Sequence, residues 1–293
     1  DLFTHTAGFS YNEDFMSVGG FPGSYQRENL FTLDSMTSLD PGALDLAGQV
    51  RKLSTMPLAN VPGTVFEYSV SVDVLGRLAE VVSGKTLDVF LKQTLFESLG
   101  MEDTGFLIAA ENIDRRAVLM KPLIRTFPVP GTYQRFEPHP LFGKKNGEIG
   151  GVIGFLSGGA GLVSTGRDMM VFARFFLDDM QLSNGRFFLS KELRSRVYTH
   201  QLPRSLGDKP LADSLPLSTG DGFSLALNIR PERGSSIRAE GPMQMDFLYW
   251  SGFTSSVFWI DFSNNVAGVF LSQIRPSQRY LVGELDEIAD NFY

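Results

Sequence analysis

The chain contains no cysteine and only three histidines among its 293 residues. Without cysteine it can form neither a disulfide nor a thiolate metal site, and it offers no cysteine nucleophile. His5, His139 and His200 match no zinc-binding spacing, so we interpret them as structural residues and predict no metal and no cofactor. The missing cysteine leaves the compartment open, because proteins on either side of a membrane can lack it.

Long apolar runs and an excess of positive charge are also missing. The longest apolar runs, such as residues 255–262, have the length of a strand and fall far short of the ~20 residues that a membrane-spanning helix needs. The formal net charge is −7, from 26 basic and 33 acidic residues, which argues against a nucleic-acid partner. With 43% hydrophobic and 20% charged residues, the composition is that of an ordinary folded domain.

Several familiar catalytic patterns are absent as well. The nearest match to a Gly-x-Ser-x-Gly elbow, at residues 222–226, lacks the final glycine and continues as strand sequence. Residues 83–86 end like a phosphate-binding loop but lack its first glycine and lie at a helix end. No serine in the chain is followed three residues later by a lysine. The glycine-rich stretch at residues 147–161 has no preceding strand, so we interpret it as a loop.

Apolar residues at helical spacing dominate the first part of the chain. They predict helices over residues 40–53, 71–83, 87–99 and 165–176. In the second of these, Asp73 and Arg77 are spaced to form an ion pair on the polar face, and Gly84 is expected to end the helix. The apolar stripe of that helix consists of Val72, Leu75, Leu78, Ala79 and Val82.

The last third of the chain changes to strand-like alternation. We predict strands over residues 223–229, 247–253, 255–262 and 266–273, with a hairpin turn at Asn264-Asn265, and then a closing helix over residues 278–292. Helices followed by a β-meander predict an α+β fold with an antiparallel sheet. We expect a mainly helical subdomain at residues 1–200, and the β-meander with the closing helix at residues 201–293.

Short segments that recur together in one family of enzymes occur here in a fixed order. The segments are residues 2–9, Pro62-Gly63, 66–69, 73–76, 82–86, 99–104, 159–165, 172–175 and 250–252. In that order they resemble the serine β-lactamase-like hydrolases, which are related to class C β-lactamases and penicillin-binding proteins. The pattern is most similar to family VIII carboxylesterases, and fungal acyltransferases of the lovastatin type carry similar segments.

The resemblance implies both a fold and a mechanism. The fold is an antiparallel sheet flanked by helices, with an inserted mainly helical subdomain, as in β-lactamases and transpeptidases. In the mechanism, the serine of a Ser-x-x-Lys motif forms an acyl-enzyme while the lysine and a tyrosine move the proton. On position, Tyr68 matches the family's catalytic tyrosine. A tyrosine has a pKa of about 10 in water, so it needs cationic neighbours to act as a base near neutral pH.

The second matching site segment lies on a predicted strand. Trp250, Ser251 and Gly252 stand where β-lactamases carry Lys-Thr-Gly, and the resemblance makes the backbone N–H of Phe253 the candidate oxyanion donor. The residue two positions after the tyrosine, an asparagine in β-lactamases, is Val70 here.

Two of these positions depart from the β-lactamase pattern in a way that points to the substrate. Trp250 cannot hold a β-lactam carboxylate as the lysine does, and Val70 cannot hydrogen-bond a substrate amide. A site without these groups favours small neutral acyl esters. The leading interpretation is therefore a serine carboxylesterase with a small-molecule ester as its partner. An acyltransferase, a β-lactamase or D-amino-peptidase type of hydrolase, and a non-catalytic binding protein of the same fold remain open.

The resemblance also marks what this chain does not hold. In the family, the Ser-x-x-Lys motif precedes the Leu-x-Thr-His-Thr segment, which here begins at Leu2. We therefore expect the nucleophile, the lysine and the first strands to precede Asp1 in a longer protein. A split or processed enzyme, or a non-catalytic relative, is the alternative. The retained Tyr68 and Trp250 argue against the non-catalytic relative.

Overall fold

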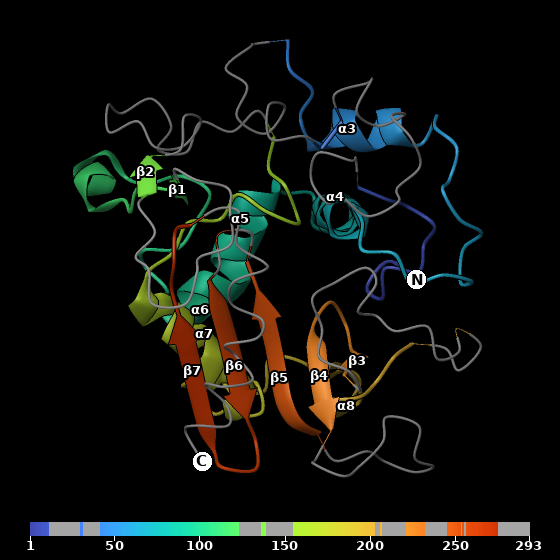
Figure 1. Ribbon diagram of the computed structural model, residues 1–293. Coiled ribbons are helices and arrows are strands. Elements are labelled where there is room, and N and C mark those ends of the chain that lie inside the picture. The colour runs from blue at the N-terminus through green and yellow to red at the C-terminus, as the bar shows by residue number, and fades with distance from the viewer. Residues whose placement is uncertain are drawn as a thin grey trace.

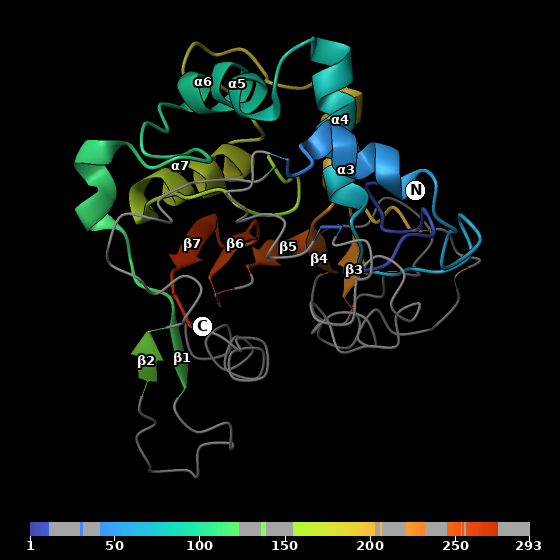
Figure 2. The same cartoon turned by 90° about the horizontal axis from the view of Figure 1, so that it is seen from above.

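The computed structural model describes residues 1–11, 30–31, 42–122, 136–138, 155–202, 206, 221–231, 245–252, 254 and 256–274. In this part of the chain, an antiparallel sheet carries a layer of helices, and α3 to α7 lie to one side of the sheet (Figure 2). This arrangement confirms the predicted α+β class. The expected closing helix at residues 278–292 and His139 lie outside the described residues.

The main sheet has five strands whose order in space follows their order in the sequence (Figure 1). All neighbouring strands are antiparallel, and Trp250 lies opposite Phe258 in the register. The strands are β3 (Gly222–Phe223), β4 (Asn228–Pro231), β5 (Met245–Ser251), β6 (Val257–Asp261) and β7 (Val266–Phe270).

The predicted turns of this sheet are partly confirmed. The hairpin at Asn264-Asn265 joins β6 to β7, and the N–H of Asn264 donates to Asp261 Oδ1 at 2.9 Å. The single strand predicted over residues 223–229 is wrong. Its middle turns back on itself to join β3 to β4, with Ala226 in the left-handed region at φ 62°.

The remaining elements lie before and beside the sheet. A small second sheet pairs β1 with β2, and Met120 of β1 also bridges to Ile274 beyond β7. The elements are α3 (Leu46–Leu53), α4 (Ser71–Ser83), α5 (Leu87–Leu91), the π-helical turn η1 (Lys92–Phe96), α6 (Glu97–Leu99), the 3-10 helix η2 (Ala110–Arg115), β1 (Met120–Pro122), β2 (Phe136–Pro138), α7 (Gly166–Leu177) and α8 (Lys191–Val197).

Helix caps explain where several helices begin and end. The helix predicted from residue 40 begins later, at Leu46, because the side chain of Asp45 caps it by accepting from the N–H of Gly48 at 2.7 Å. The helix predicted over residues 87–99 ends at Gly100, as expected, but its middle is the π-helical turn η1. Helix α8 was not predicted from the sequence.

Helix α4 confirms the predicted bounds but not the predicted faces. It ends at Gly84, which has φ 68°. The apolar stripe is only partly buried, because Leu78 and Val82 are 50% and 79% exposed and its other members are half-buried. The predicted Asp73–Arg77 pair is wrong, because Arg77 pairs with Glu80 at 2.9 Å while Asp73 is buried. The first turn of α4 turns its small and polar residues inward, and this placement governs the site described below.

Helix α7 joins the helical layer to the sheet. The hydroxyl of Thr165 caps it by accepting from the N–H of Asp168 at 3.2 Å, as the sequence predicts. Its aromatic face packs on β6 and β7, and the rings of Phe172 and Phe258 lie 5.6 Å apart. Burial of these rings removes a large apolar area from water and fixes the layer on the sheet.

Candidate active site

The candidate site lies where the start of α4 meets the end of β5. Strand β5 runs toward the layer that holds α4 and α5 (Figure 1). The rings of Tyr68 and Trp250 lie 5.7 Å apart, inclined at 45°. Two residues that the sequence singled out from segments far apart in the chain are thus brought into contact.

Tyr68 is held by aromatic and hydrogen-bonding neighbours from the N-terminal segment. Its ring lies 4.7 Å from the ring of His5 and 5.2 Å from that of Tyr11. His5 Nδ1 accepts the backbone N–H of Ser69 at 3.2 Å, so the imidazole fixes the backbone beside Tyr68. His5 is therefore a buried, hydrogen-bonded structural residue, in line with the sequence interpretation.

The electrostatics of this site favour a protonated tyrosine. Burial and the charge of Asp73 raise the pKa of Tyr68 to about 12, while a hydrogen bond from Tyr11 acts in the opposite direction. Burial, together with Tyr68 and the charge of Asp73, raises the pKa of Tyr11 well above its usual value. No positively charged side chain of the described residues contributes to the pKa of Tyr68. For Tyr68 to act as a base near neutral pH, a cation must be added beside it.

The charge of Asp73 acts on both phenols, and the sequence did not identify this role. It is 2% exposed, and its Oδ1 accepts hydrogen bonds from the hydroxyl of Ser157 and, at 3.4 Å, from the N–H of Gly159. Burial raises the pKa of Asp73 to about 6 despite these hydrogen bonds. The signal in the sequence was a lone acidic residue in the first turn of a helix, which we interpreted as an exposed ion-pair partner.

The segment matched to Lys-Thr-Gly forms the end of β5. Trp250 packs between Tyr68 and Phe223, whose ring is 6.0 Å away. Ser251 pairs with Val257, and Gly252 is exposed, with its N–H donating to the carbonyl of Ser256 at 2.6 Å.

Two other residues expected at the site do not join this contact. Phe253, the candidate oxyanion donor, lies outside the described residues. Val70 immediately precedes α4 and is 1% exposed within the core cluster that contains Leu87 and Phe106. Its side chain faces the interior of the helical layer and offers no hydrogen bond.

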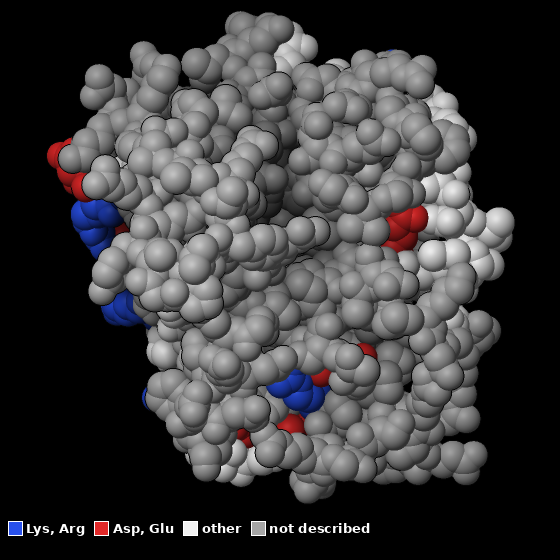
Figure 3. Space-filling model, in the orientation of Figure 1, with Lys and Arg blue, Asp and Glu red and all other residues white. Residues whose placement is uncertain are grey.

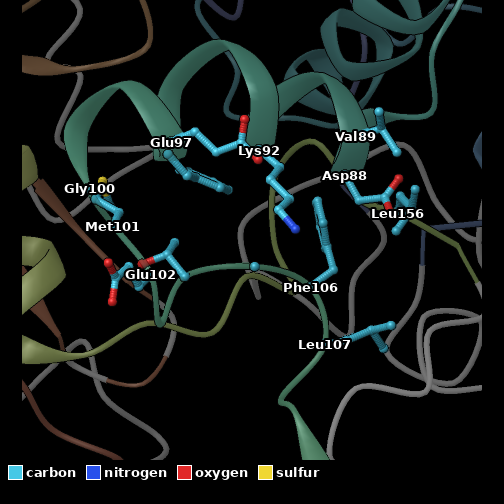
Figure 4. A pocket seen from close by; sticks show the side chains of 13 residues that line it. Asp88, Val89, Lys92, Glu97, Gly100, Met101, Glu102, Phe106, Leu107 and Leu156 are labelled. Carbon is cyan, nitrogen blue, oxygen red and sulfur yellow. The ribbon is translucent and has the colours of Figure 1, made fainter.

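A cavity of about 1080 Å³ lies beside the helical layer. Figure 4 shows the side chains of Lys92 and Phe106 pointing into it from η1 and from the segment after α6. Neither Tyr68 nor Trp250 is among its described lining residues. The sequence did not predict this cavity, because the cavity depends on how residues 101–107 lie against α5, η1 and α6.

Within the described residues, no three His, Asp or Glu side chains gather as a metal site would require, and no helix is long and apolar enough to cross a membrane. On the face shown in Figure 3, the basic and acidic side chains of the described part lie in small separate groups, some of both signs and one of acidic side chains alone. The aromatic pair and the buried carboxylate are thus the chemical features of this site.

Comparisons with known proteins concern the family and the fold of this chain. The family model described as Beta-lactamase matches residues 1–290. Protein Rv1367c of Mycobacterium tuberculosis is 27% identical over 276 residues, covering 94% of this chain and 62% of that protein. Esterase EstB of Burkholderia gladioli is 29% identical over 180 residues, covering 58% of this chain and 41% of the esterase.

A solved structure shows the same fold. EstCE1, described as a hydrolase with promiscuous acyltransferase activity, matches with a TM-score of 0.62 at 21% identity, over 93% of this chain and 66% of that chain. The chain thus spans less than two thirds of the length of the two curated relatives described above. The chain belongs to the Beta-lactamase family and has the β-lactamase/transpeptidase-like fold of its serine hydrolases.

Proposed function

We propose that this protein is a carboxylesterase that cleaves small acyl esters through an acyl-enzyme, with Tyr68 taking part in proton transfer. The observation that carries the proposal is the contact between the rings of Tyr68 and Trp250, 5.7 Å apart. It joins the two segments that match the family's catalytic tyrosine and the strand beside the acyl group. The adjacent rings of a tyrosine and a tryptophan provide an apolar surface, which favours binding of an apolar acyl group.

The choice of substrate rests on what two positions cannot bind. Trp250 provides an apolar ring where a lysine would attract a carboxylate, and Val70, at the position of the family's asparagine, lies in the core and supplies no donor or acceptor to the site. An anionic lactam or a peptide would therefore leave its polar groups without partners at this site. The name of the relative EstB and the description of EstCE1 as a hydrolase support ester cleavage.

The proposed reaction proceeds in two steps that each move one proton. A serine hydroxyl attacks the ester carbonyl, its proton passes through the lysine and Tyr68 to the departing alkoxide, and an alcohol leaves an acyl-serine behind. Water then attacks the acyl-serine and the carboxylic acid departs. One proton of the water passes through Tyr68 and the lysine back to the serine oxygen. The serine and lysine are those of the Ser-x-x-Lys motif. We propose that a longer form of the protein supplies this motif.

A lysine beside Tyr68 would lower the pKa that burial and Asp73 raise. With a pKa of about 12, the phenol keeps its proton at neutral pH and can donate a hydrogen bond. An ammonium group placed within a few ångströms favours the phenolate and lowers that pKa, so proton exchange with the serine becomes possible. We propose that the backbone N–H of Phe253 then stabilises the oxyanion.

The test measures turnover of short-chain aryl esters and of benzylpenicillin by the full-length protein. We expect ester hydrolysis with little penicillin turnover, and Tyr68→Phe should lower ester turnover by about 100-fold or more, the range for a lost proton-transfer group. Tyr198→Phe is a matched control, because that hydroxyl donates to the carbonyl of Phe176 at 2.9 Å, on another element. Efficient penicillin cleavage without esterase activity would contradict the proposed substrate class, and full activity of Tyr68→Phe would remove Tyr68 from the mechanism.

A second candidate function is transfer of the same acyl group to an alcohol or an amine. The description of EstCE1, with its promiscuous acyltransferase activity, favours it. Adding an alcohol to the ester assay distinguishes the two functions, because transfer produces a new ester at the expense of the free acid. A protein that neither hydrolyses nor transfers, and that forms no acyl-enzyme with an aryl ester, would instead be a non-catalytic relative.

A further inference from the structure

A buried network of hydrogen bonds fastens the first turn of α4 to the loop after residue 156. The hydroxyl of Ser157 donates to Asp73 Oδ1 and also accepts the N–H of Gly159 at 3.2 Å and that of Ala160 at 3.0 Å. The N–H of Gly159 also donates to Asp73 Oδ1. Asp73 and Ser157 are 2% and 4% exposed. One carboxylate and one hydroxyl thus fix the backbone of this loop against the helix.

Two glycines allow the loop to come so close. A Cβ on Gly158 would lie 2.2 Å from the carbonyl oxygen of Val72, which is far inside contact distance. On the helix, a Cβ on Gly76 would lie 3.1 Å from the Cα of Gly158. The loop backbone therefore rests directly on the helix backbone, and Asp73 holds it there.

The same network reaches the tyrosine pair. A Cβ on Gly159 would lie 3.2 Å from both Asp73 Oδ2 and the hydroxyl of Tyr11, so the carboxylate and that hydroxyl flank one backbone position. Tyr11 in turn hydrogen-bonds Tyr68, and its ring lies 5.2 Å from that of Tyr68. The negative charge of Asp73 acts on both phenols. Asp73 forms no ion pair within the described part of the chain, so no cation there screens its charge.

We infer that Asp73 and Ser157 are positioning residues, which hold the loop at residues 157–160 beneath the Tyr11–Tyr68 pair and set the electrostatic environment in which Tyr68 transfers its proton. The inference deepens the proposed function and rests on it. Neither residue touches the substrate. Asp73 acts on Tyr68 through Tyr11 and through its charge, and Ser157 acts by orienting the carboxylate.

The chain contains a matched comparison for Asp73. Asp168 holds the corresponding place in the first turn of α7 and is 1% exposed. Its Oδ2 accepts the N–H of Asp103 at 2.9 Å and the hydroxyl of Thr104 at 2.8 Å, so it also fastens a loop to a helix. It contributes to the pKa of neither Tyr11 nor Tyr68. Replacing Asp168 therefore removes a buried carboxylate without changing the field at the phenols.

The first experiment detects the coupling without any substrate. Proteins labelled with ¹³C at tyrosine Cζ are titrated from pH 5 to 8 by NMR, and the signals of Tyr11 and Tyr68 are identified by their loss in the phenylalanine variants. We expect both signals to shift with a midpoint near the Asp73 pKa of about 6. The shift should vanish in Asp73→Asn and persist in Asp168→Asn. Signals that stay constant, or that titrate in Asp73→Asn as in the parent, would overturn the inference.

The second experiment measures ester turnover in the full-length protein. Asp73→Asn keeps the shape and the acceptor for Ser157 but removes the charge, and we expect kcat to fall by about tenfold or more while KM changes by less than about twofold. Ser157→Ala keeps the charge of Asp73 but removes the hydrogen bond from residue 157 to Asp73, and it should also lower kcat. This variant provides the test if Asp73→Asn does not fold. Asp168→Asn should retain the parent kcat.

The two proposals fail in different ways. If the parent hydrolyses no ester or Tyr68→Phe is fully active, the proposed function fails, while the NMR titration still decides whether Asp73 is coupled to the phenols. If the parent is active and needs Tyr68, but Asp73→Asn and Ser157→Ala both keep the parent kcat, the positioning role is wrong and the proposed function stands.

Discussion

The buried imidazole of His5 makes the stability of the helical layer depend on pH. His5 is 1% exposed, and burial lowers its pKa from 6.5 to about 3. Its Nδ1 accepts the N–H of Ser69, so the neutral form is the one that fits. Below pH 6.5 the unfolded chain binds a proton at this residue that the folded chain does not. Folding stability from His5 is therefore complete above pH 6.5 and is lost as the pH falls toward 3.

The size of this loss follows from the width of the pH interval. Between pH 6.5 and 4.5, only the unfolded chain binds a proton at this residue. Over these two pH units the free energy of unfolding therefore falls by about 3 kcal/mol. Asp73 acts in the opposite direction, because its raised pKa of about 6 makes the folded chain bind a proton more tightly than the unfolded chain does. Acidification from pH 6 to 4.5 therefore restores about 1.5 kcal/mol at Asp73. The two effects largely offset one another in the parent protein.

The variant His5→Asn separates these two effects. His5 has φ 51°, a conformation that asparagine tolerates, and the asparagine side chain can still accept from Ser69. Loss of the ring contacts with Tyr68 and Phe223 should destabilise the variant at pH 7.5 by about 1–3 kcal/mol. At pH 4.5 this deficit should shrink by about 3 kcal/mol or reverse, because the parent has lost the contribution of its buried neutral imidazole.

Urea unfolding followed by tryptophan fluorescence at the two pH values measures the difference. Comparing parent and variant at the same pH cancels the titration of all other groups. A deficit that is equal at pH 7.5 and 4.5, within about 0.5 kcal/mol, would refute the reasoning. It would show that His5 is protonated in the folded state near its ordinary pKa, and hence that the imidazole is not held dry beside Tyr68.

Two further changes test the packing of the sheet and of α7. Gly268→Ala should lower the free energy of unfolding by about 1–3 kcal/mol, because a Cβ there would lie 2.1 Å from the indole ring of Trp259 on the neighbouring strand. Thermal or urea denaturation measures this change. An unchanged midpoint would show that the ring can move aside. Thr165→Ala should lower the free energy of unfolding by about 1 kcal/mol through loss of the α7 cap, while Thr165→Ser should keep most of the stability. Equal losses in the two variants would exclude the cap as the cause.

The sequence predicted elements well where local chemistry decides them. Gly84 and Gly100, both in the left-handed conformation, end helices at the predicted residues, and Thr165 caps α7. The turn at Asn264-Asn265 joins the strands that it was expected to join. Each of these signals acts through its own backbone or through a partner three or four residues away, so a single sequence carries it.

The sequence failed where contacts across the fold decide. The apolar stripe of α4 predicted a buried face that is only partly buried in the structure, whereas Asp73, which looked like a surface residue, is buried by a loop about 85 residues later in the chain. The contact of Tyr68 with Trp250 agrees with a resemblance to known enzymes, and no local pattern predicts it. The roles of the site residues, like the expected subdomain boundary near residue 200, stay predictions.

The distance in sequence between Tyr68 and Trp250, about 180 residues, has a consequence for folding. Such a contact costs loop-closure entropy that no local structure repays, so it cannot form before the helical layer has docked on the sheet. We expect α4, which follows Tyr68, and β5, which holds Trp250, to form earlier, because α4 depends on local turns and β5 on its antiparallel neighbours. We therefore expect the site to be the last part of this protein to assemble and the first to come apart under mild denaturant.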